Sequence, residues 1–391
     1  TGTDPSLPPV LLQSKNLTKI YPGTTRKAVD DLSFEVREGE VLSFLGANGA
    51  GKSTTMAMLS GTSSPTRGDA LIDGKSISMD KNGAKKNVGV CFQSDVIWSD
   101  LSVGFHLWFF GKVRGLGGRE LDQAVTNMLD SLGFPEKRGH LAGKLSGGQK
   151  RRLCVGLSMM GKNKVVYLDE PTAGLDPVSR RQLWELIERN RARRAILLTT
   201  HFMDEADILG DRIAVVKEGR MRACGSSKWL KGKFGIGYLL RCAMAIKKDA
   251  SEMEAAQNFV KHAVAAAVPE AELASSAGTE LSFRLPKDKS SSFPALFEKF
   301  DGNKEAVTSY GVEATTLEEV FMEIVNEDVE HLAVVAPRDG AATVSTTAAA
   351  AAAAAKRYVI KGKKQPTDVS SFTDTEVDAM LRPGRSQTGD C

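Results

Sequence analysis

The sequence lacks several features that would place a protein in a familiar class. Its five cysteines form no paired pattern, which argues against a disulfide framework or a zinc site and suits a reducing compartment. There is no uninterrupted apolar run of about 18 residues, so the chain is not expected to cross a membrane itself. The opening "TGTDPSLPPVLL" has no basic flank and apolar stretch of signal-peptide type. The widely spaced cysteines are Cys91, Cys154, Cys224, Cys242 and Cys391.

Net charge is also small. A formal charge of +4 over 391 residues, with bases and acids interleaved, lacks the electrostatic footprint of a nucleic-acid-binding protein. The 41% hydrophobic and 26% charged content is that of an ordinary globular protein. Its length suits roughly two to three domains. We therefore expect a globular protein with a sizeable core and no nucleic-acid partner.

Short apolar runs alternate with helical patterns between residues 11 and 235. The runs are "VLSFLG" before residue 46, "VVYLDE" at 165–170, "AILLTTH" at 195–201 and "IAVVKEG" at 213–219. Strands that are buried on both faces have this composition. A mostly helical insertion is expected at about 96–160, where "LDQAVTNMLDSLGF" has helical spacing. The pattern predicts a layered α/β core that carries a helical subdomain.

A smaller unit is expected at 236–330. It reads as a strand "GYLLRCAMAI", a helix "SEMEAAQNFVKHAVAAAV", a strand "ELSFRL", a helix "FPALFEKF", the segment "VTSYGVEA" and a last helix. Thr316 and Glu319 have the spacing of a capping box, which supports a helix start there. Residues 331–391 contain an alanine run and few large apolar residues, and are expected to be a linker or a disordered tail.

The stretch "GANGAGKST" places a glycine-rich turn between a predicted strand and a predicted helix. Gly46, Gly51, Lys52 and Ser53 complete the phosphate-loop motif G-x-x-x-x-G-K-[ST] in the context that it requires. Glycines allow backbone N–H groups to surround phosphate oxygens, the lysine reaches the outer phosphates, and the serine offers a hydroxyl to Mg²⁺. The nucleotide-binding prediction covers Gly46, Ala47, Asn48, Gly49, Ala50, Gly51, Lys52, Ser53 and Thr54.

Two acids end the strand "VVYLDE". Asp169 is well placed to hold Mg²⁺, and Glu170 follows where a carboxylate can polarise an attacking water. A pair of solvated turn residues is the alternative. A second glycine turn, "LSGGQKRR" at 145–152, precedes another predicted helix and provides a second anion-binding N-terminus. Its residues are Leu145, Ser146, Gly147, Gly148 and Gln149.

Together these motifs resemble the nucleotide-binding domain of an ATP-binding-cassette protein, in which LSGGQ is the signature motif. The resemblance implies that Tyr21 stacks on adenine, that Gln93 is the Q-loop glutamine and a Mg²⁺ ligand, and that Asp176 lies in the D-loop. It makes His201 the switch histidine, catalytic together with Gln93 and Glu170. Taken singly, Tyr21 could be a strand-end aromatic, and His201 an ordinary hydrogen-bonded histidine.

The segment after His201 narrows the resemblance to the A subfamily of these transporters. "HFMDEADILGDRIAVVKEGRMRACGSSKWLKGKFGIGYLL" and "TTLEEVFMEI" resemble the exit from the cassette and the end of the subfamily's regulatory domain, and "LGDRIA" favours a first cassette. The fold implied is a P-loop NTPase core (11–235) with a mixed or parallel sheet, a helical signature subdomain (about 96–160) and a small C-terminal α+β regulatory domain (236–330).

The function implied by this resemblance is ATP hydrolysis that powers transport, commonly of lipids. Implied partners are Mg²⁺, transmembrane domains and a second cassette from the same or another chain, whose signature motif completes the ATP site. The location implied is the cytoplasmic face of a membrane, with the chain itself soluble. A soluble cassette ATPase unconnected to transport is the alternative, and a non-hydrolysing interaction module is a third reading.

Two regions invite more specific hypotheses. Trp98, Trp108, Phe109 and Phe110 follow the Q-loop, and they either receive a coupling helix of a transmembrane domain or belong to the subdomain core. Burial of all four would exclude the first reading. The 236–330 unit is expected to regulate the ATPase without touching the nucleotide. The transported substrate and the direction of transport cannot be read from the sequence.

Overall fold

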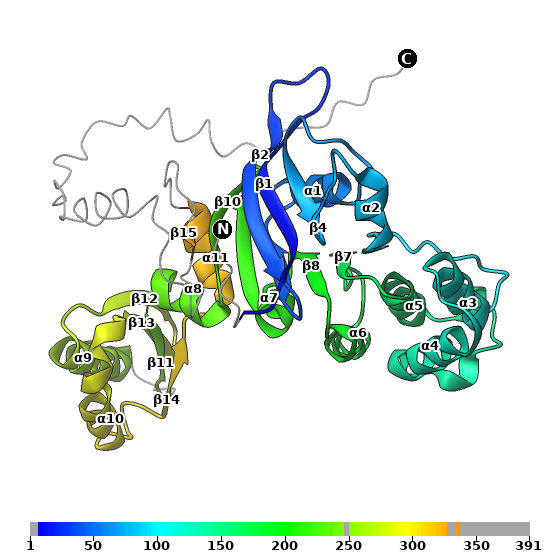
Figure 1. The fold of residues 1–391 in the computed structure, drawn as a ribbon. Coiled ribbons are helices and arrows are strands. Elements are labelled where there is room, and N and C mark those ends of the chain that lie inside the picture. Colours follow the sequence, from blue (N-terminus) through cyan, green and yellow to red (C-terminus); the bar gives the residue numbers. More distant parts are fainter. Residues whose placement is uncertain (1–6, 236, 246–249, 327–333, 336–391) are drawn as a thin grey trace, which may run out of the picture. The chain divides into compact units, whose positions relative to one another are not determined.

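The computed structural model describes residues 7–235, 237–245, 250–326 and 334–335 (Figure 1). Its central sheet has the order β15-β10-β9-β3-β8-β7-β6. The strands β9, β3, β8, β7 and β6 run parallel, β10 lies antiparallel to β9, and β15 lies parallel to β10. The bounds are β3 (Val41–Leu45), β6 (Val88–Cys91), β7 (Val165–Asp169), β8 (Ala195–Thr200), β9 (Arg212–Lys217), β10 (Arg220–Gly225) and β15 (Val334–Val335).

The parallel strands bring four of the predicted motifs together at the side of the sheet where their carboxyl ends lie. The segments that follow β3, β6, β7 and β8 carry the phosphate loop, Gln93, Glu170 and His201. Because parallel strands have their carboxyl ends at the same edge, these segments meet there, which is where α/β sheets bind ligands.

The parallel strands β3, β7, β8 and β9 are buried on both faces, as their apolar runs predicted, whereas the parallel strand β6 was not predicted. In β7, Val166 and Leu168 belong to one hydrophobic cluster, while Val165 and Tyr167 belong to another. Alternate residues of a strand point to opposite faces, so the two clusters lie on the two sides of the sheet. The predicted α/β class with a mixed sheet is confirmed.

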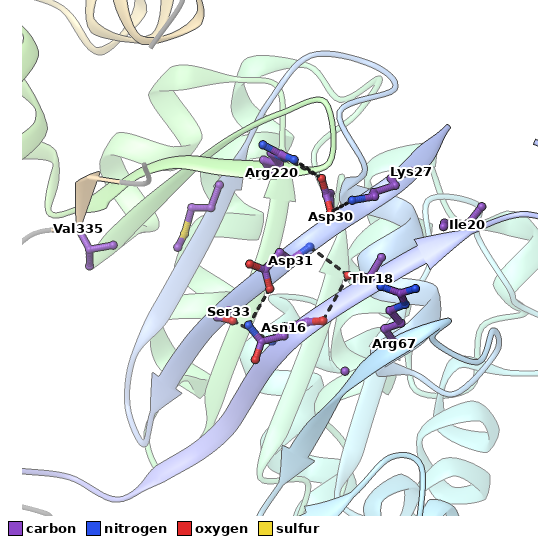
Figure 2. A pocket seen from close by; sticks show the side chains of 12 residues that line it. Asn16, Thr18, Ile20, Lys27, Asp30, Asp31, Ser33, Arg67, Arg220 and Val335 are labelled. Atoms are coloured by element: carbon purple, nitrogen blue, oxygen red, sulfur yellow. Dashed lines mark hydrogen bonds and ion pairs between the residues drawn. The ribbon is translucent and has the colours of Figure 1, made fainter. Parts of the chain in front are cut away.

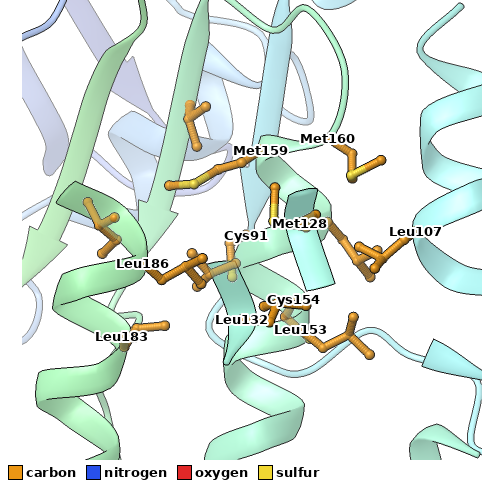
Figure 3. Packing of buried hydrophobic residues seen from close by; sticks show 14 of the residues in the cluster. Cys91, Leu107, Met128, Leu132, Leu153, Cys154, Met159, Met160, Leu183 and Leu186 are labelled. Atoms are coloured by element: carbon orange, nitrogen blue, oxygen red, sulfur yellow. The ribbon is translucent and has the colours of Figure 1, made fainter. Parts of the chain in front are cut away.

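Helices supply the first of these clusters (Figure 3). Ser102 caps helix α3 by accepting a hydrogen bond from the Phe105 N–H at 3.1 Å. Gly133 ends helix α4 with a positive φ of 76°. Buried side chains from all four helices pack with those of β7 and β8. The helices are α3 (Val103–Val113), α4 (Gly118–Leu132), α5 (Gly147–Met159) and α6 (Pro177–Asn190), with short 3₁₀ turns η1 (Pro135–Lys137) and η2 (Ala142–Lys144).

An antiparallel sheet supplies much of the second cluster, and this sheet was not predicted from the sequence. Its order is β2-β1-β4-β5, and its two long strands pair with several register shifts. Each shift interrupts the regular alternation of apolar and polar residues, so periodicity gives a weak signal. The elements are β1 (Val10–Ile20), β2 (Lys27–Arg37), β4 (Arg67–Ile72), β5 (Lys75–Ser76), α1 (Lys52–Leu59) and α2 (Lys81–Lys86).

A third sheet lies in the predicted 236–330 unit and has the order β12-β13-β11-β14, all antiparallel. Two helices share its hydrophobic cluster. The strand β12 was missed because it is an edge strand with every residue exposed, so it has no apolar alternation. The elements are β11 (Tyr238–Ala243), α9 (Ala250–Ala267), β12 (Glu272–Ala277), β13 (Glu280–Leu285), η3 (Lys287–Ser292), α10 (Phe293–Asp301) and β14 (Ser309–Ala314).

The last helix, α11 (Leu317–Asn326), packs elsewhere. Its capping box is confirmed: the Glu319 N–H donates to Thr316 Oγ1 at 3.2 Å, and the Thr316 N–H donates to Glu319 Oε2 at 3.0 Å. Its apolar face joins a cluster with strands β3 and β9 and with α7 (Met203–Leu209) and α8 (Ser227–Phe234). The helix therefore shares a core with the 11–235 unit, although its sequence position placed it in the 236–330 unit.

The predicted tail, 331–391, is described at two residues only. Val334 and Val335 form β15, which pairs with Ala223 and Cys224 at the edge of the central sheet. The rest of the predicted tail lies outside the described residues. Among the helices that the structure describes, none combines the length and the apolarity needed to span a membrane.

Candidate functional site

The phosphate-loop motif forms a turn in which particular positions require glycine. A Cβ at Gly46 would lie 2.6 Å from the Val216 carbonyl oxygen, and one at Gly51 would lie 2.5 Å from that of Ala28. Gly51 also has a φ of 105° and stands at the N-cap of α1, where no side chain accepts from the first turn. Among the described residues, no N-cap side chain accepts from the N–H groups that open α1, which suits an anion at this point.

Lys52 is buried beneath the loop, with 5% of its surface exposed. Its ammonium donates to the carbonyl oxygens of Gly46 at 2.7 Å and Ala47 at 3.2 Å. Burial lowers the pKa of this lysine, and the charges of Glu170 and Asp169 oppose that change. A desolvated cation among carbonyl dipoles is arranged to attract phosphate oxygens.

Glu170 stands at the meeting point of four chain segments. Its Oε1 lies 3.8 Å from Lys52 Nζ and 3.4 Å from His201 Nδ1, and its Oε2 accepts a hydrogen bond from Gln93 Nε2 at 3.3 Å. The residue has a φ of 45°, a left-handed conformation that is uncommon outside glycine. Its N–H donates to Thr199 Oγ1 at 3.1 Å, which helps to hold that conformation.

Ser53 and Asp169 form a pair of oxygen donors beside this group. Ser53 Oγ lies 3.4 Å from Asp169 Oδ1, which also accepts from Thr199 Oγ1 at 2.5 Å. One hydroxyl and one carboxylate fit Mg²⁺, which is usually bound by one or two carboxylates together with substrate phosphates and water. Among the described residues no cluster of three or more His, Cys, Asp or Glu side chains could hold a metal without a substrate.

Gln93 was predicted as a further Mg²⁺ ligand as well as a catalytic residue. Its amide N–H₂ is directed at Glu170 in the structure. This contact places the side chain next to the predicted catalytic carboxylate, and the ligand role remains a prediction.

Tyr21 lies at the end of β1, close to the phosphate loop. Its hydroxyl lies 3.5 Å from Thr54 Oγ1, and 42% of the residue is exposed. The Lys19 ammonium lies 5.3 Å from the ring centroid. A half-exposed ring that touches the loop is suitably placed for stacking on a base.

The signature residues lie at the start of α5. Ser146 Oγ accepts from the Gln149 N–H at 3.3 Å, while Gln149 Oε1 accepts from the Ser146 N–H at 3.2 Å. Asp176 likewise caps α6, accepting from the N–H groups of Val178 and Ser179 at 3.0 Å, and the Ser179 hydrogen bonds lower its pKa. Within the described chain, no hydrogen bond or ion pair joins residues 145–149 to residues 46–54.

Two buried residues near the carboxyl ends of the parallel strands were not predicted from the sequence. Thr199 is fully buried and contacts both acids at the end of β7. Glu205, also fully buried, accepts from Trp184 Nε1 at 3.4 Å, and its burial raises the pKa of its carboxyl group. The hydroxyls of "LLTTH" in an otherwise apolar strand were the available hint of Thr199.

The aromatic residues after Gln93 divide between surface and core. Trp98 is 47% exposed and Trp108 is 42% exposed, while Phe109 and Phe110 are half-buried. The Trp98 ring lies 5.5 Å from that of Phe109 and 6.3 Å from that of Phe110, measured between centroids. Since the four are not all buried, the condition that would exclude a docking surface is not met.

None of the predicted site residues lines a groove of about 850 Å³ on the antiparallel sheet (Figure 2). Asp30 in this groove pairs with Lys27 at 2.8 Å and with Arg220 at 2.5 Å, and Asn16 Nδ2 donates to Asp31 Oδ1 at 2.6 Å. These polar groups satisfy one another, so the groove gives no reason to move the site away from the phosphate loop.

Comparisons with known proteins agree with this geometry. Residues 29–173 match the family model described as "ABC transporter", and residues 238–317 match "ACT-like domain". The chain is 42% identical over 311 residues to "ABC transporter A family member 6" of Dictyostelium discoideum, covering 78% of this chain and 19% of that protein. It is 41% identical over 317 residues to the human "Phospholipid-transporting ATPase ABCA3", covering 80% of this chain and 18% of that protein.

Among solved structures, cbiO1 of Clostridium perfringens, part of the ABC transporter complex cbiONQ, is similar with a TM-score of 0.53 and 29% identity, covering 58% of this chain and 92% of that one. The chain spans about a fifth of the length of the curated relatives that it matches. The order of the motifs, their meeting at one sheet edge and these similarities lead to one conclusion: the chain belongs to the ATP-binding-cassette family and carries the nucleotide-binding domain of an A-subfamily member.

Proposed function

We propose that this chain binds and hydrolyses ATP with Mg²⁺ and that the hydrolysis powers transport across a membrane. The observation that supports this most strongly is the meeting of Lys52, Gln93 and His201 at the Glu170 carboxylate. The N–H groups of α1 and the Lys52 ammonium bind phosphate oxygens, and Tyr21 stacks on the base. Ser53 and Asp169 would hold Mg²⁺, with Gln93 as a further ligand, and the ion would neutralise phosphate charge.

Hydrolysis depends on Glu170, which accepts a proton from the attacking water. Gln93 and His201 hold hydrogen-bonding groups against the same carboxylate and orient it. Ser146, Gly147, Gly148 and Asp176 stand apart from residues 46–54 in the chain's own contacts. They serve instead the ATP site of a second cassette, in the same chain or another, so that two ATP molecules lie between two cassettes.

Lipid transport is the more specific proposal. It rests on the relative whose name is "Phospholipid-transporting ATPase ABCA3". The transmembrane domains would contact the cassette at Trp98 and Trp108, which are exposed next to the Q-loop, placing the chain on the cytoplasmic face of a membrane. Replacing both tryptophans with serine in the full-length protein should lower transport while the isolated chain keeps its ATP turnover. Unchanged transport would contradict this contact.

Residues 236–330 are proposed to regulate the ATPase without contacting the nucleotide. Because α11 packs with Leu45, Ile213 and Val215, deletion of the whole range would expose the core. Removing 238–314 and keeping α11 is the cleaner test. ATP affinity should remain nearly unchanged, and a large loss of affinity in the folded truncated chain would contradict the proposal.

The decisive variant for ATP hydrolysis is Glu170→Gln, which retains the shape and removes the base. General-base catalysis contributes about 10² to 10⁴-fold in rate, so phosphate release should fall by that factor while ATP still binds. Glu185→Gln, an exposed change on α6, is the control and should retain parental turnover. Parental turnover in Glu170→Gln would show that another group is the base.

A further inference from the structure

Arg151 lies two residues beyond the signature motif, on α5, and its guanidinium is buried with 4% of the residue exposed. Every nitrogen of the group has an acceptor. Nε donates to the Pro171 carbonyl oxygen at 2.8 Å, and Nη2 donates to those of Asp169 and Glu170, both at 3.0 Å. A buried guanidinium is costly unless its donors are satisfied, and here they are.

The remaining nitrogen reaches a different segment. Nη1 donates to the Phe92 carbonyl oxygen at 2.7 Å and to Asp95 Oδ1 at 3.3 Å. Phe92 directly precedes Gln93, so one rigid, planar group holds the backbone on both sides of the Gln93 to Glu170 contact. A planar fork with fixed donor directions fixes the spacing of what it binds.

The contact with the Glu170 backbone has a second consequence. Glu170 is held at a φ of 45°, and its carbonyl oxygen accepts from Arg151 while its N–H donates to Thr199. A left-handed conformation in a residue with a side chain persists only where surrounding groups hold it. Arg151 therefore helps to determine where the carboxylate of Glu170 points.

From this geometry we infer that Arg151 is a positioning residue for hydrolysis, which fixes the Q-loop and the catalytic glutamate relative to the helix that carries the signature motif. This inference rests on the proposed ATPase function. Since α5 begins at the signature motif, the same guanidinium mechanically links the chain's own ATP site to the residues that complete a partner's site.

The neighbouring Arg152 offers a matched control. It is also buried on α5, but its Nη1 donates to the Leu132 carbonyl oxygen at 2.8 Å and its guanidinium lies 5.2 Å from the Phe134 ring centroid. Both partners belong to the helical subdomain. Its loss should affect packing and stability, and should leave the Gln93 and Glu170 segments in place.

The test compares Arg151→Lys with Arg152→Lys in the full chain. A lysine keeps the charge but cannot reach five acceptors from one nitrogen. Because a misplacement of about 1 Å can cost on the order of 10²-fold in rate, Arg151→Lys should lower kcat by about 10 to 100-fold. The Kd for ATP should change by less than about threefold, since the phosphate loop is untouched, and Arg152→Lys should keep kcat within about twofold.

Hydrogen exchange supplies a readout that needs no turnover. Amides in 92–95 and 169–173 should exchange faster in Arg151→Lys and at the parental rate in Arg152→Lys. Equal exchange in both variants, or an equal fall in kcat, would overturn the inference. A parent chain that releases no phosphate would contradict the ATPase proposal, and the exchange comparison would still decide the role of Arg151.

If Arg151→Lys fails to fold, Asp95→Asn provides a second test. This variant should accelerate amide exchange at 92–95 alone, and unchanged exchange there would count against the link between Arg151 and the Q-loop.

Discussion

Helices α1 and α5 both begin at a glycine-rich turn, and they satisfy their first N–H groups in different ways. At α1 the N-cap is Gly51, which has no side chain to accept a hydrogen bond. At α5 the N-cap is Ser146, and a complete capping box with Gln149 closes the first turn. An uncapped N-terminus leaves its first N–H groups to water or to a ligand such as an anion, whereas the capping box of α5 satisfies the N–H groups of Ser146 and Gln149 within the chain.

This difference suggests an order of events. Under the proposed function, we expect nucleotide to bind first at α1, where Lys52 is already desolvated and Gly51 provides no side-chain acceptor for the N–H groups of the first turn. The first turn of α5 is already capped by Ser146 and Gln149 within this chain. Gly147 leaves open space where a Cβ would stand, so a second cassette can approach it closely. We therefore expect the two helix starts to act at successive steps of the proposed ATPase cycle.

The largest effect on this comparison is expected from Lys52→Ala. The change removes a charge-assisted partner of the phosphates, worth about 1.5 to 3 kcal/mol, so the Kd for ATP should rise about 10 to 100-fold. Titration with a fluorescent ATP analogue measures it. Lys81→Ala, an exposed change on α2, should leave affinity at the parental value. Parental affinity in Lys52→Ala would show that α1 alone holds the nucleotide.

A smaller effect is expected from Ser146→Ala, which removes the cap of α5. Loss of an N-cap costs about 1 kcal/mol of stability, and the melting temperature should fall accordingly. Ser226→Ala is the matched control, because Ser226 caps α8 by accepting from the Trp229 N–H at 3.2 Å. Both variants should melt slightly lower, while turnover should fall in Ser146→Ala alone. Equal ATP turnover in Ser146→Ala and Ser226→Ala would show that Ser146 only caps its helix and takes no part in hydrolysis.

The smallest effect concerns a third helix start, α7, which lacks a side-chain cap at Phe202 and carries the buried Glu205 in its first turn. Burial raises the pKa of Glu205 in the folded chain and outweighs the opposing influence of Thr200, Thr172, Trp184 and the charge of Arg180. The folded state therefore favours the protonated acid. Stability from this group is present below the unfolded pKa and is lost as the pH rises through the higher folded pKa.

Glu205→Gln cannot ionise, so its melting temperature relative to the parent chain should increase as the pH rises through that window. Calorimetric melting from acid to neutral pH measures the difference. Glu188→Gln, an exposed change on α6, should show no such trend. A difference for Glu205→Gln that stays flat with pH would indicate that the buried carboxylate is fully compensated by its partners.

The sequence was informative where local chemistry determines structure. The buried runs before Gly46 and at 165–170 predicted strands, and parallel pairing then brings Lys52 and Glu170 together. Thr316 and Glu319 marked a helix start that the structure contains. Contacts made through the backbone left no such pattern. Arg151 donates hydrogen bonds to carbonyl oxygens, which every residue possesses. The segment "KRRL" therefore does not predict which residues it binds.

Long-range packing was equally hidden. The register shifts between β1 and β2 obscure their alternation, and the exposed β12 has none. The apolar face of α11 predicted burial but could not indicate which core would bury it. Whether such a helix packs on the nearest sheet or on β3 and β9 depends on the whole surface available to it, which local periodicity does not encode.

The most direct test of the central claim is the mass of Glu170→Gln in solution, measured by light scattering at several concentrations with and without Mg-ATP. If the open end of α1 binds ATP and the signature end of a second copy completes the site, uncleaved ATP should hold two chains together. The account predicts the mass of one chain without nucleotide and of two chains with Mg-ATP, and only one chain when Lys52→Ala is added. The mass of a single chain at saturating ATP and every concentration would contradict a site shared between copies of this chain.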